Sequence, residues 1–258
     1  MNPTSSSVQT LIESGLHHSR YLQRLAQSNP LLLEDLHGEL HTPWNAESMT
    51  AALAASEISD EASLKTALRM LRKRVMLRLI VRDISGLADL REVMSNATQL
   101  AEVTTRFALE HLTNWLNTQY GQPIGEESGE VQDLIVVGMG KLGGGELNVS
   151  SDIDLIFAYP EEGETTGPRH VGNHEYFTAL GKKLITALNE NTQDGFVFRV
   201  DMRLRPYGDS GPLAGSFAML ENYYHTQGRE WERYAWIKGR PICGSQYQEL
   251  ADMLRPFV

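Results

Sequence analysis

Two aspartates two positions apart, Asp152 and Asp154, have the type and spacing that most directly suggest chemistry. They begin the apolar segment "DIDLIFAY", which has the length of a short strand. Side chains two residues apart in a strand point to the same face, so the two carboxylates would lie side by side. Adjacent carboxylates repel each other unless a cation lies between them, and their oxygens suit Mg²⁺ or Mn²⁺. The pair therefore indicates a metal site, and a solvated strand start is the alternative.

A third aspartate, Asp201, lies in a segment of alternating character, residues 196–204, which we predict to be a strand. Its apolar side chains are expected on one face, with Asp201, Arg199 and Arg203 on the other. A carboxylate there would complete a three-acid site, and these arginines with Arg205 could hold phosphate oxygens in a fork. The alternative is that Asp201 only pairs with a neighbouring arginine.

Three glycines, Gly138, Gly140 and Gly143, spell G-x-G-x-x-G directly after an apolar run. This pattern is typical of a dinucleotide-binding turn, but that fold needs a crossover of roughly a dozen residues or more before the next strand. Only eight residues (144–151) separate Gly143 from Asp152. A P-loop is also excluded, because Leu142 stands where Ser or Thr is required. A glycine turn still lets backbone N–H groups approach phosphate.

A glycine-rich turn, a D-x-D pair and a later strand acid together indicate a two-metal centre for phosphoryl or nucleotidyl transfer. In such a centre, one cation activates the attacking oxygen. Both cations stabilise the charge that develops on the phosphorus and on the leaving group.

The elements before this site are predicted to be helical from about residue 8 to 118. Apolar residues at three- and four-residue steps from Leu64 indicate one helix, with Ser59 as its N-cap. A second helical stretch covers residues 87–120. The Gly/Pro/acid-rich segment 121–130 is the best candidate for a domain boundary.

After that boundary the pattern changes to short strands and helices. Strands are predicted at residues 133–137 and 154–159, with an exposed loop at 160–169. An amphipathic helix follows from Tyr176 and is expected to end at Asp194-Gly195. From residue 216 to the end of the sequence the pattern is helical.

The composition excludes several classes of protein. The chain has 258 residues, a net charge of −10 and one cysteine, so an intrachain disulfide and a Cys-rich zinc site are excluded. We expect no nucleic-acid partner, because the basic run at residues 69–82 lies on a helix expected to be buried. The pair His170 and His174 lacks the helical context of a zinc site. No signal peptide or apolar run long enough to span a membrane is visible, so a cytoplasmic protein without membrane contact is expected.

Two segments carry a family resemblance, "GMGKLGGGELNVSSDIDLIFAY" and "FRVDMRLRPYGDSGPL". They resemble the glutamine synthetase adenylyltransferase/adenylyl-removing enzymes of the DNA polymerase β-like nucleotidyltransferase superfamily. The resemblance covers about residues 130–245, and "QGREWERYAWIK" is similar to the amino-terminal half of those enzymes. It implies an α+β fold, whose nucleotidyltransferase core is a small mixed sheet with helices. We expect a helical region at 1–122, the core at 123–212, and the start of a helical segment at 213–258, so that the chain is a fragment.

The resemblance assigns site residues one by one. The metal-binding acids would be Asp152, Asp154 and Asp201, and Gly143, Gly144 and Ser151 would lie toward phosphate or nucleotide. Independently of the resemblance, Arg203 and Arg205 are candidates for binding the incoming phosphate, with Lys141 as a further candidate; a structural or solvated role is the alternative for each. The seven residues between Gly144 and Asp152 are fewer than the superfamily usually has, which leaves open which glycines touch phosphate.

The resemblance implies that the amino-terminal half removes AMP from a tyrosine of glutamine synthetase. Inorganic phosphate would attack the adenylyl phosphorus and release ADP, with Mg²⁺ or Mn²⁺ as cofactor. A PII signalling protein would be the regulator. Two alternatives remain open: transfer of AMP from ATP to the same tyrosine, and a non-catalytic fragment that only docks glutamine synthetase or PII.

Overall fold

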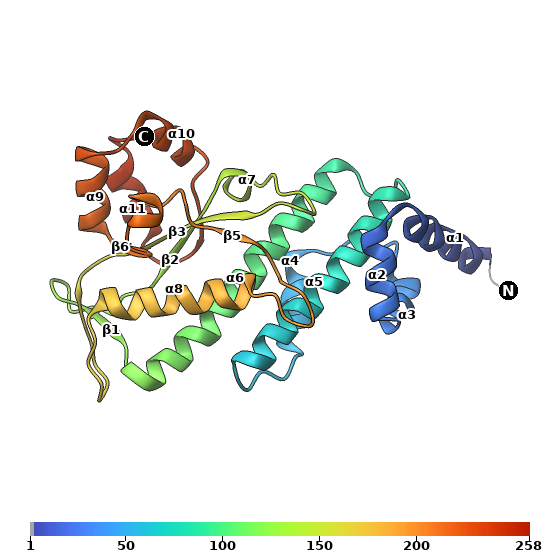
Figure 1. Ribbon diagram of the computed structural model, residues 1–258, viewed down its shortest axis with the longest axis horizontal. Coiled ribbons are helices and arrows are strands. Elements are labelled where there is room, and N and C mark those ends of the chain that lie inside the picture. The colour runs from blue at the N-terminus through green and yellow to red at the C-terminus, as the bar shows by residue number, and fades with distance from the viewer. Residues whose placement is uncertain (1–2) are drawn as a thin grey trace. The chain divides into compact units, whose positions relative to one another are not determined.

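The structure is a computed structural model that describes residues 3–258, with side chains from Val8 onward. Its helices and small mixed sheets confirm the predicted α+β class (Figure 1). The helices are α1 (Pro3–His18), α2 (Arg20–Ser28), α3 (Leu31–Glu39), α4 (Ala46–Ala54), α5 (Glu61–Ile84), α6 (Leu90–Tyr120), α7 (Gly140–Gly143), α8 (Asn173–Asn189), α9 (Phe217–Thr226), α10 (Glu230–Trp236) and α11 (Tyr247–Leu254), with a 3-10 turn η1 (Gly208–Ser210). The strands are β1 (Pro123–Gly125), β2 (Ile135–Met139), β3 (Ile153–Tyr159), β4 (Gly163–Thr165), β5 (Val200–Asp201), β6 (Ala214–Ser216) and β7 (Arg240–Cys243).

The chain divides into two compact units. The helical unit comprises the residues up to Val103 together with Leu147–Ser150, and the sheet unit comprises Thr104–Glu146 and Ser151–Val258. This division falls inside α6, whereas the sequence pattern changes after residue 120. The predicted domain limits at 122 and 212 describe changes of pattern and stay a prediction.

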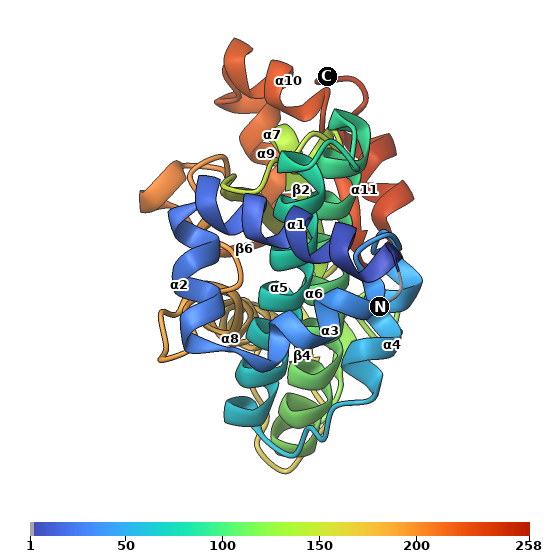
Figure 2. The same ribbon diagram turned by 90° about the vertical axis from the view of Figure 1, so that its right-hand side faces the viewer.

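In the helical unit, α1 to α4 all pack against the long helix α5 (Figure 2). The apolar core here contains Leu22, Leu36 and Val81, each at most 3% exposed. The N-cap of α5 is Asp60 and not Ser59 as predicted, because the Asp60 carboxylate accepts a 2.8 Å hydrogen bond from the Ser63 N–H.

The basic run on α5 turns three of its arginines inward. Arg69, Arg78 and Arg82 are at most 7% exposed. Arg82 donates to the carbonyl oxygen of Leu40 at 2.7 Å and forms a 2.7 Å ion pair with Glu92. These buried, partnered guanidinium groups agree with the expectation that this run serves packing and ion pairing.

The sheet unit is built around β3. Strand β2 pairs antiparallel with one edge of β3, and β7 pairs antiparallel with the other edge of β2. The remaining edge of β3 is shared: β5 pairs parallel with its beginning and β6 parallel with its end. A separate two-stranded sheet joins β1 to β4.

Helices cover both faces of this sheet (Figure 1). On one face, Ile135, Val137 and Ile156 pack with residues of α9, α10 and α11 in a single core cluster. On the other, α8 lies against β3, where the ring of Phe177 stacks on Tyr159 at 4.8 Å. The site described below lies at the end of the sheet where β3 begins.

Several predicted boundaries were wrong. The strand predicted at 196–204 has only two paired residues, because Val197 and Phe198 are both buried and their N–H groups bond to Leu188 at the end of α8 instead of to a strand. The predicted loop 160–169 contains β4 with a buried Thr165, α8 ends at Asn189 before Asp194, and the predicted helical end contains strand β7. Strands β2 and β3 lie within two residues of their predicted limits. None of the helices between residues 3 and 258 has the length and apolar character needed to cross a membrane.

Candidate active site

Strand register brings two of the predicted acids together. Asp154, on β3, is paired across the parallel ladder with Asp201 on β5, and across the antiparallel ladder with Met139 on β2. Paired residues point to the same face of a sheet, so the two carboxylates lie side by side. Asp154 lies on the face of Ile156, opposite Leu155, as the D-x-D spacing predicts.

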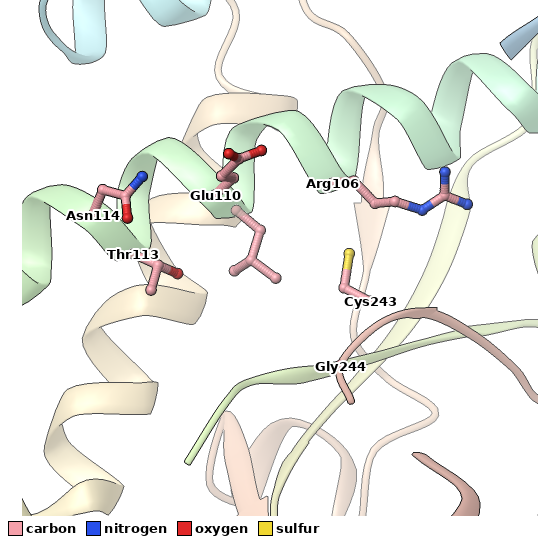
Figure 3. Close-up of a pocket in the computed structure, with 7 residues that line it drawn as sticks. Arg106, Glu110, Thr113, Asn114, Cys243 and Gly244 are labelled. Carbon is pink, nitrogen blue, oxygen red and sulfur yellow. The ribbon is translucent and has the colours of Figure 1, made fainter. Parts of the chain in front are cut away.

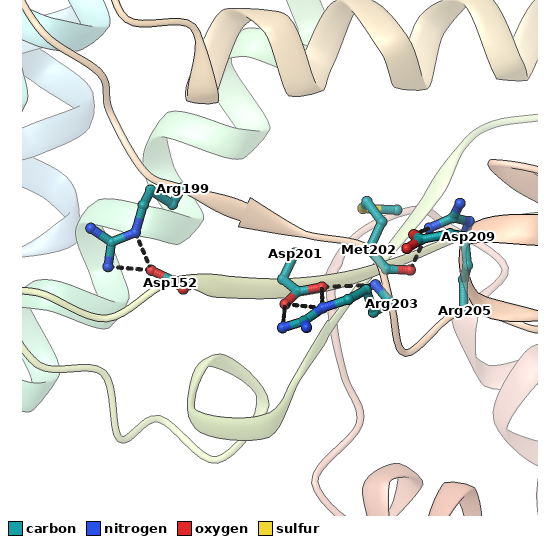
Figure 4. A network of polar contacts seen from close by, with 7 residues as sticks. All are labelled: Asp152, Arg199, Asp201, Met202, Arg203, Arg205 and Asp209. Carbon is teal, nitrogen blue, oxygen red and sulfur yellow. Dashed lines mark hydrogen bonds and ion pairs between the residues drawn. The ribbon is translucent and has the colours of Figure 1, made fainter.

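Two of the three acids are held by arginines (Figure 4). Asp152 immediately precedes β3 and does not open it as predicted, and its carboxylate forms an ion pair with Arg199. The Asp201 carboxylate accepts from the Arg203 Nε at 2.8 and 3.0 Å and from the Arg203 backbone N–H at 2.8 Å. Asp154 has no ion-pair partner among the residues that the structure describes.

The electrostatics differ between the neighbouring carboxyls. Burial raises the pKa of Asp154, and the carboxylates of Asp201 and Asp152 raise it further against the opposing effect of Arg203 and Lys141. The hydrogen bonds from Arg203 lower the pKa of Asp201. Asp154 is therefore the carboxyl whose environment is short of positive charge.

Each glycine of the predicted phosphate turn has a packing role. Gly138 lies in β2, where a Cβ would come within 2.8 Å of a side chain of α7. Gly140 opens α7 with φ +53°, and its Cβ would lie 2.8 Å from Oδ2 of Asp154. Gly143 is buried, and a Cβ there would overlap the carbonyl oxygen of Lys238. The turn is thus a tight corner against Asp154, and the antiparallel pairing of β2 with β3 confirms that no Rossmann crossover exists.

The donor set fits a hard divalent cation in part. Asp154 and Asp201 supply adjacent carboxylate oxygens, the ligands that Mg²⁺ and Mn²⁺ prefer, and the raised pKa of Asp154 marks a place where a cation would be stabilising. As placed, no group of three or more His, Cys, Asp or Glu side chains in the described part of the chain is gathered closely enough to hold a metal ion. Asp152 would join the other two acids only after leaving Arg199.

The remaining predicted site residues lie around this corner. The Gly144 N–H already donates to Gly140 at 3.0 Å, so it is engaged within the turn. Ser151 lies just before β3, and Lys141 is exposed on α7. Arg205 is largely buried, with Nη1 bonded to the Met202 carbonyl oxygen at 2.7 Å and Nε unbonded. Phosphate or nucleotide contact by these residues stays a prediction.

Sequence reasoning missed one residue that shapes the corner and misjudged the role of another. Arg240, on the unpredicted strand β7, donates to the carbonyl oxygens of Gly143 and Leu142, both at 3.0 Å, and so caps the end of α7. Gly140 was read as part of a phosphate motif, whereas its close approach to Asp154 depends on the pairing of β2 with β3. The only sign of Arg240 in the sequence was a basic residue shortly after the aromatic residues of α10.

A separate cavity lies elsewhere in the sheet unit (Figure 3). It has a volume of about 370 Å³ between α6 and the end of β7, and its lining includes Arg106, Glu110, Thr113 and Cys243. Arg106 donates to the carbonyl oxygen of Ile242 at 2.9 Å and thereby covers part of the sheet edge. None of the predicted site residues lines this cavity.

The sequence of the chain is similar to those of known proteins. Residues 10–253 match the model of the family described as glutamate-ammonia ligase adenylyltransferase. A protein of Nitrosomonas eutropha is 53% identical over 99% of the chain, and one of Chromobacterium violaceum is 58% identical over 93%. Both bear the name bifunctional glutamine synthetase adenylyltransferase/adenylyl-removing enzyme. The chain spans only 28% and 27% of the lengths of these two curated relatives.

Proposed function

The chain belongs to the glutamate-ammonia ligase adenylyltransferase family, and from that premise we propose that it is a nucleotidyltransferase that removes AMP from an adenylylated tyrosine of glutamine synthetase. The reaction proposed is a metal-dependent phosphorolysis. The substrate is supported by the names of the relatives, which specify both addition and removal of the adenylyl group.

The observation that carries the proposal is the in-register pairing of Asp154 with Asp201 beside the glycine corner. Two carboxylates on one face, one with a raised pKa and no ion-pair partner, create a local excess of negative charge. A protein retains such an arrangement at a cost in stability unless a cation neutralises it. In phosphoryl transfer, such a cation would stabilise the charge on the reacting oxygens.

Mg²⁺ or Mn²⁺ would be held by Asp154 and Asp201, with Asp152 as a third ligand. When bound, the cation would neutralise charge on the phosphoryl oxygens and favour the attacking oxygen. The protein's part is to fix these carboxylates. Strand pairing sets the positions of Asp154 and Asp201, and the glycine corner lets the backbone of Gly140 approach without a side chain in the way.

In phosphorolysis an oxygen of inorganic phosphate bonds to the adenylyl phosphorus and the bond from that phosphorus to the tyrosine oxygen breaks. The products are ADP and a tyrosine hydroxyl, which takes up one proton. Two phosphoryl groups must be neutralised at once, and Arg203 and Arg205 are the candidates for that role. Arg205 is pre-oriented by its bond to the Met202 carbonyl oxygen, and its Nη1 also lies 3.5 Å from the Asp209 carboxylate. The fork of the arginine group matches phosphate oxygens, which supports it as an anion ligand.

Addition of AMP from ATP is the second candidate, because the relatives' names include it and the same atoms would serve it. Similarity of "QGREWERYAWIK" to the amino-terminal, adenylyl-removing half supports removal instead. A docking role for glutamine synthetase or PII is the third candidate. Regulation by a PII protein is proposed from the family resemblance, and location in the cytoplasm from the sequence pattern.

The test uses adenylylated glutamine synthetase, Mg²⁺ and inorganic phosphate with the purified chain. ADP release supports removal, whereas AMP incorporation from ATP without ADP release supports addition. The Asp154→Asn variant should lower the rate by at least about a hundredfold, which is the order of effect expected when a group that stabilises transition-state charge is lost.

A full-length relative under the same conditions is the positive control. If that relative releases ADP and the chain neither releases ADP nor incorporates AMP, the docking role is favoured. If Asp154→Asn keeps the full rate in either reaction, the acidic site is not the catalytic site.

A further inference from the structure

Asp152 and Asp201 each form an ion pair with an adjacent arginine. Asp152 pairs with Arg199, whose carbonyl oxygen also accepts from the Ile153 N–H at 2.9 Å. Asp201 pairs with Arg203, two residues further along the chain, through Nε at 2.8 and 3.0 Å. Asp154, between them, has no such partner in the described part of the chain. Figure 4 shows the two pairs following one another along this edge of the sheet.

Both arginines are easily displaced. The Arg199 side chain is 55% exposed and that of Arg203 76% exposed, so water solvates each guanidinium group even while it is paired. Exposed ion pairs contribute little to stability. The Asp201 side chain is only 18% exposed, so the entering cation must take the place of the guanidinium group as its counterion. A cation and the arginines compete for the same atoms, because a cation bound to Asp152 and Asp201 would use the carboxylate oxygens that the arginines now contact.

We propose that Arg199 and Arg203 are exchangeable counterions: a divalent cation entering the site displaces them from Asp152 and Asp201, and the released guanidinium groups bind the phosphate that reacts. This inference rests on the proposed function, because it assumes the same cation site. It adds Arg199 as an anion ligand and makes the two ion pairs the resting state of the site.

The exchange follows from charge and geometry. A cation and a guanidinium group repel each other, so both cannot be held by one carboxylate at full strength. Arg199 lies beside the start of β3 and Arg203 is the second residue after β5, so each stays within the site after release. The planar fork of arginine matches phosphate oxygens as well as it matches a carboxylate.

A reciprocal coupling results. The cation frees the arginines and thereby tightens phosphate binding, and phosphate holds the arginines away from the carboxylates and thereby tightens cation binding. Thermodynamic linkage requires the two effects to be equal in size. Direct contact between cation and phosphate would also produce coupling, so the discriminating measurement is cation binding without phosphate.

The experiment titrates Mn²⁺ without phosphate into the wild-type chain, Arg199→Gln and Arg203→Gln, and follows free Mn²⁺ by its paramagnetic resonance signal. Each variant should bind Mn²⁺ about two- to fivefold more tightly than wild type, the factor corresponding to the loss of one competing exposed ion pair. A residue that merely supports the fold would change affinity in the opposite direction. Arg255→Gln is the matched control, because Arg255 is 75% exposed and pairs with Asp252.

A second titration repeats each measurement with inorganic phosphate, corrected by a protein-free blank for Mn²⁺–phosphate complexes. Phosphate should tighten Mn²⁺ binding to wild type by about fivefold or more. It should tighten binding less in Arg199→Gln and Arg203→Gln, and as in wild type in Arg255→Gln.

The NMR signals of the arginine Nε–H groups provide a second measurement, and this one is made on the wild-type chain. Adding Mg²⁺ to the wild-type chain should shift the signals of Arg199 and Arg203 and leave that of Arg255 in place. Unchanged signals, or Gln variants that bind Mn²⁺ no more tightly than wild type, overturn the exchange. If the wild-type chain binds no Mn²⁺, or Asp154→Asn binds it equally well, the cation site fails and the proposed function loses its metal dependence as well.

Discussion

Replacing Gly140 by alanine tests the corner between the glycine turn and the acid directly. Gly140 has φ +53°, a conformation that costs an L-residue about 1–2 kcal/mol. The new Cβ would also lie 2.8 Å from Oδ2 of Asp154, whereas ordinary contact begins at 3.4 Å. The carboxylate must therefore move by 3.4 − 2.8 = 0.6 Å, or the turn must shift by the same amount.

Gly145 provides the matched control in the same segment. It has φ +70°, and a Cβ there meets nothing within 4 Å. Gly145→Ala should therefore lose the same stability of about 1–2 kcal/mol while leaving Asp154 in place. The backbone strain is common to the two variants. A difference in their Mn²⁺ affinity therefore measures the effect of displacing the Asp154 carboxylate.

Thermal unfolding and Mn²⁺ binding are the two assays. For a chain of this size, 1 kcal/mol corresponds to roughly 2–4 °C in Tm, so both variants should unfold about 2–8 °C below wild type. A misplacement of 1 Å costs about a hundredfold in a preorganised site, so 0.6 Å should weaken Mn²⁺ binding and any AMP removal by about tenfold in Gly140→Ala only. Equal losses of Mn²⁺ affinity in the two variants, or none in Gly140→Ala, would refute the reasoning.

Four further substitutions test the glycine turn, a helix cap and a buried hydrogen bond. Gly143→Ala should destabilise the sheet unit by about 1–3 kcal/mol because its Cβ has no space, whereas Gly144→Ala, which meets only flexible side chains at 3.3 Å, should stay within about 0.5 kcal/mol of wild type in urea unfolding. Asp60→Asn should remove a pH dependence: capping lowers the pKa of Asp60 below its usual 3.8, so the charged cap stabilises above that pH and is lost as pH falls through the folded-state pKa. The Tm advantage of wild type over Asp60→Asn at pH 7 should therefore shrink below pH 3.8. Tyr223→Phe should cost about 1–3 kcal/mol in urea unfolding, because the buried Glu232 carboxylate loses a 2.7 Å hydrogen bond.

Contrary outcomes are equally definite. If Gly144→Ala is as damaging as Gly143→Ala, the two glycines share a role that the packing does not describe. A Tm difference at position 60 that is constant from pH 7 to pH 3 would rule out a charged cap. A Tyr223→Phe variant as stable as wild type would mean that Glu232 is satisfied without the tyrosine.

Local patterns were sufficient for much of the fold. The helical stripe beginning at Leu64 and the apolar strand after Asp152 depend only on residues close in sequence, and both elements lie within a few residues of their predicted limits. The segment 196–204 has strand-like alternation, yet only Val200 and Asp201 pair, because its neighbours bond to the end of α8. The alternation of apolar and polar residues indicates which side chains are buried. It does not indicate which backbone N–H and C=O groups pair with another strand.

The contacts within the candidate site were less accessible to sequence reasoning. That Asp154 and Asp201 are adjacent depends on a register set between strands distant in the chain. The approach of Gly140 to Asp154 and the capping of α7 by Arg240 likewise need strand pairing before they exist. Sequence reasoning identified the acids as a group from their chemistry and raised the pairing of Asp201 with a neighbouring arginine as an alternative, but it did not predict that Arg199 holds Asp152.

The shared edge of β3 has a dynamic consequence. Because β5 and β6 both pair with this one strand, the loop of residues 202–213 is tied at its two ends to the same rigid support. Closing such a loop costs little chain entropy, and its motion is confined to a swing about two fixed hinges. The exposed side chain of Arg203 can therefore be mobile on the nanosecond-to-microsecond timescale of loops without any change in the sheet, whereas Arg205 is largely buried. Backbone amide hydrogens should exchange faster within this loop than in β3, as expected for a mobile loop attached to a rigid sheet.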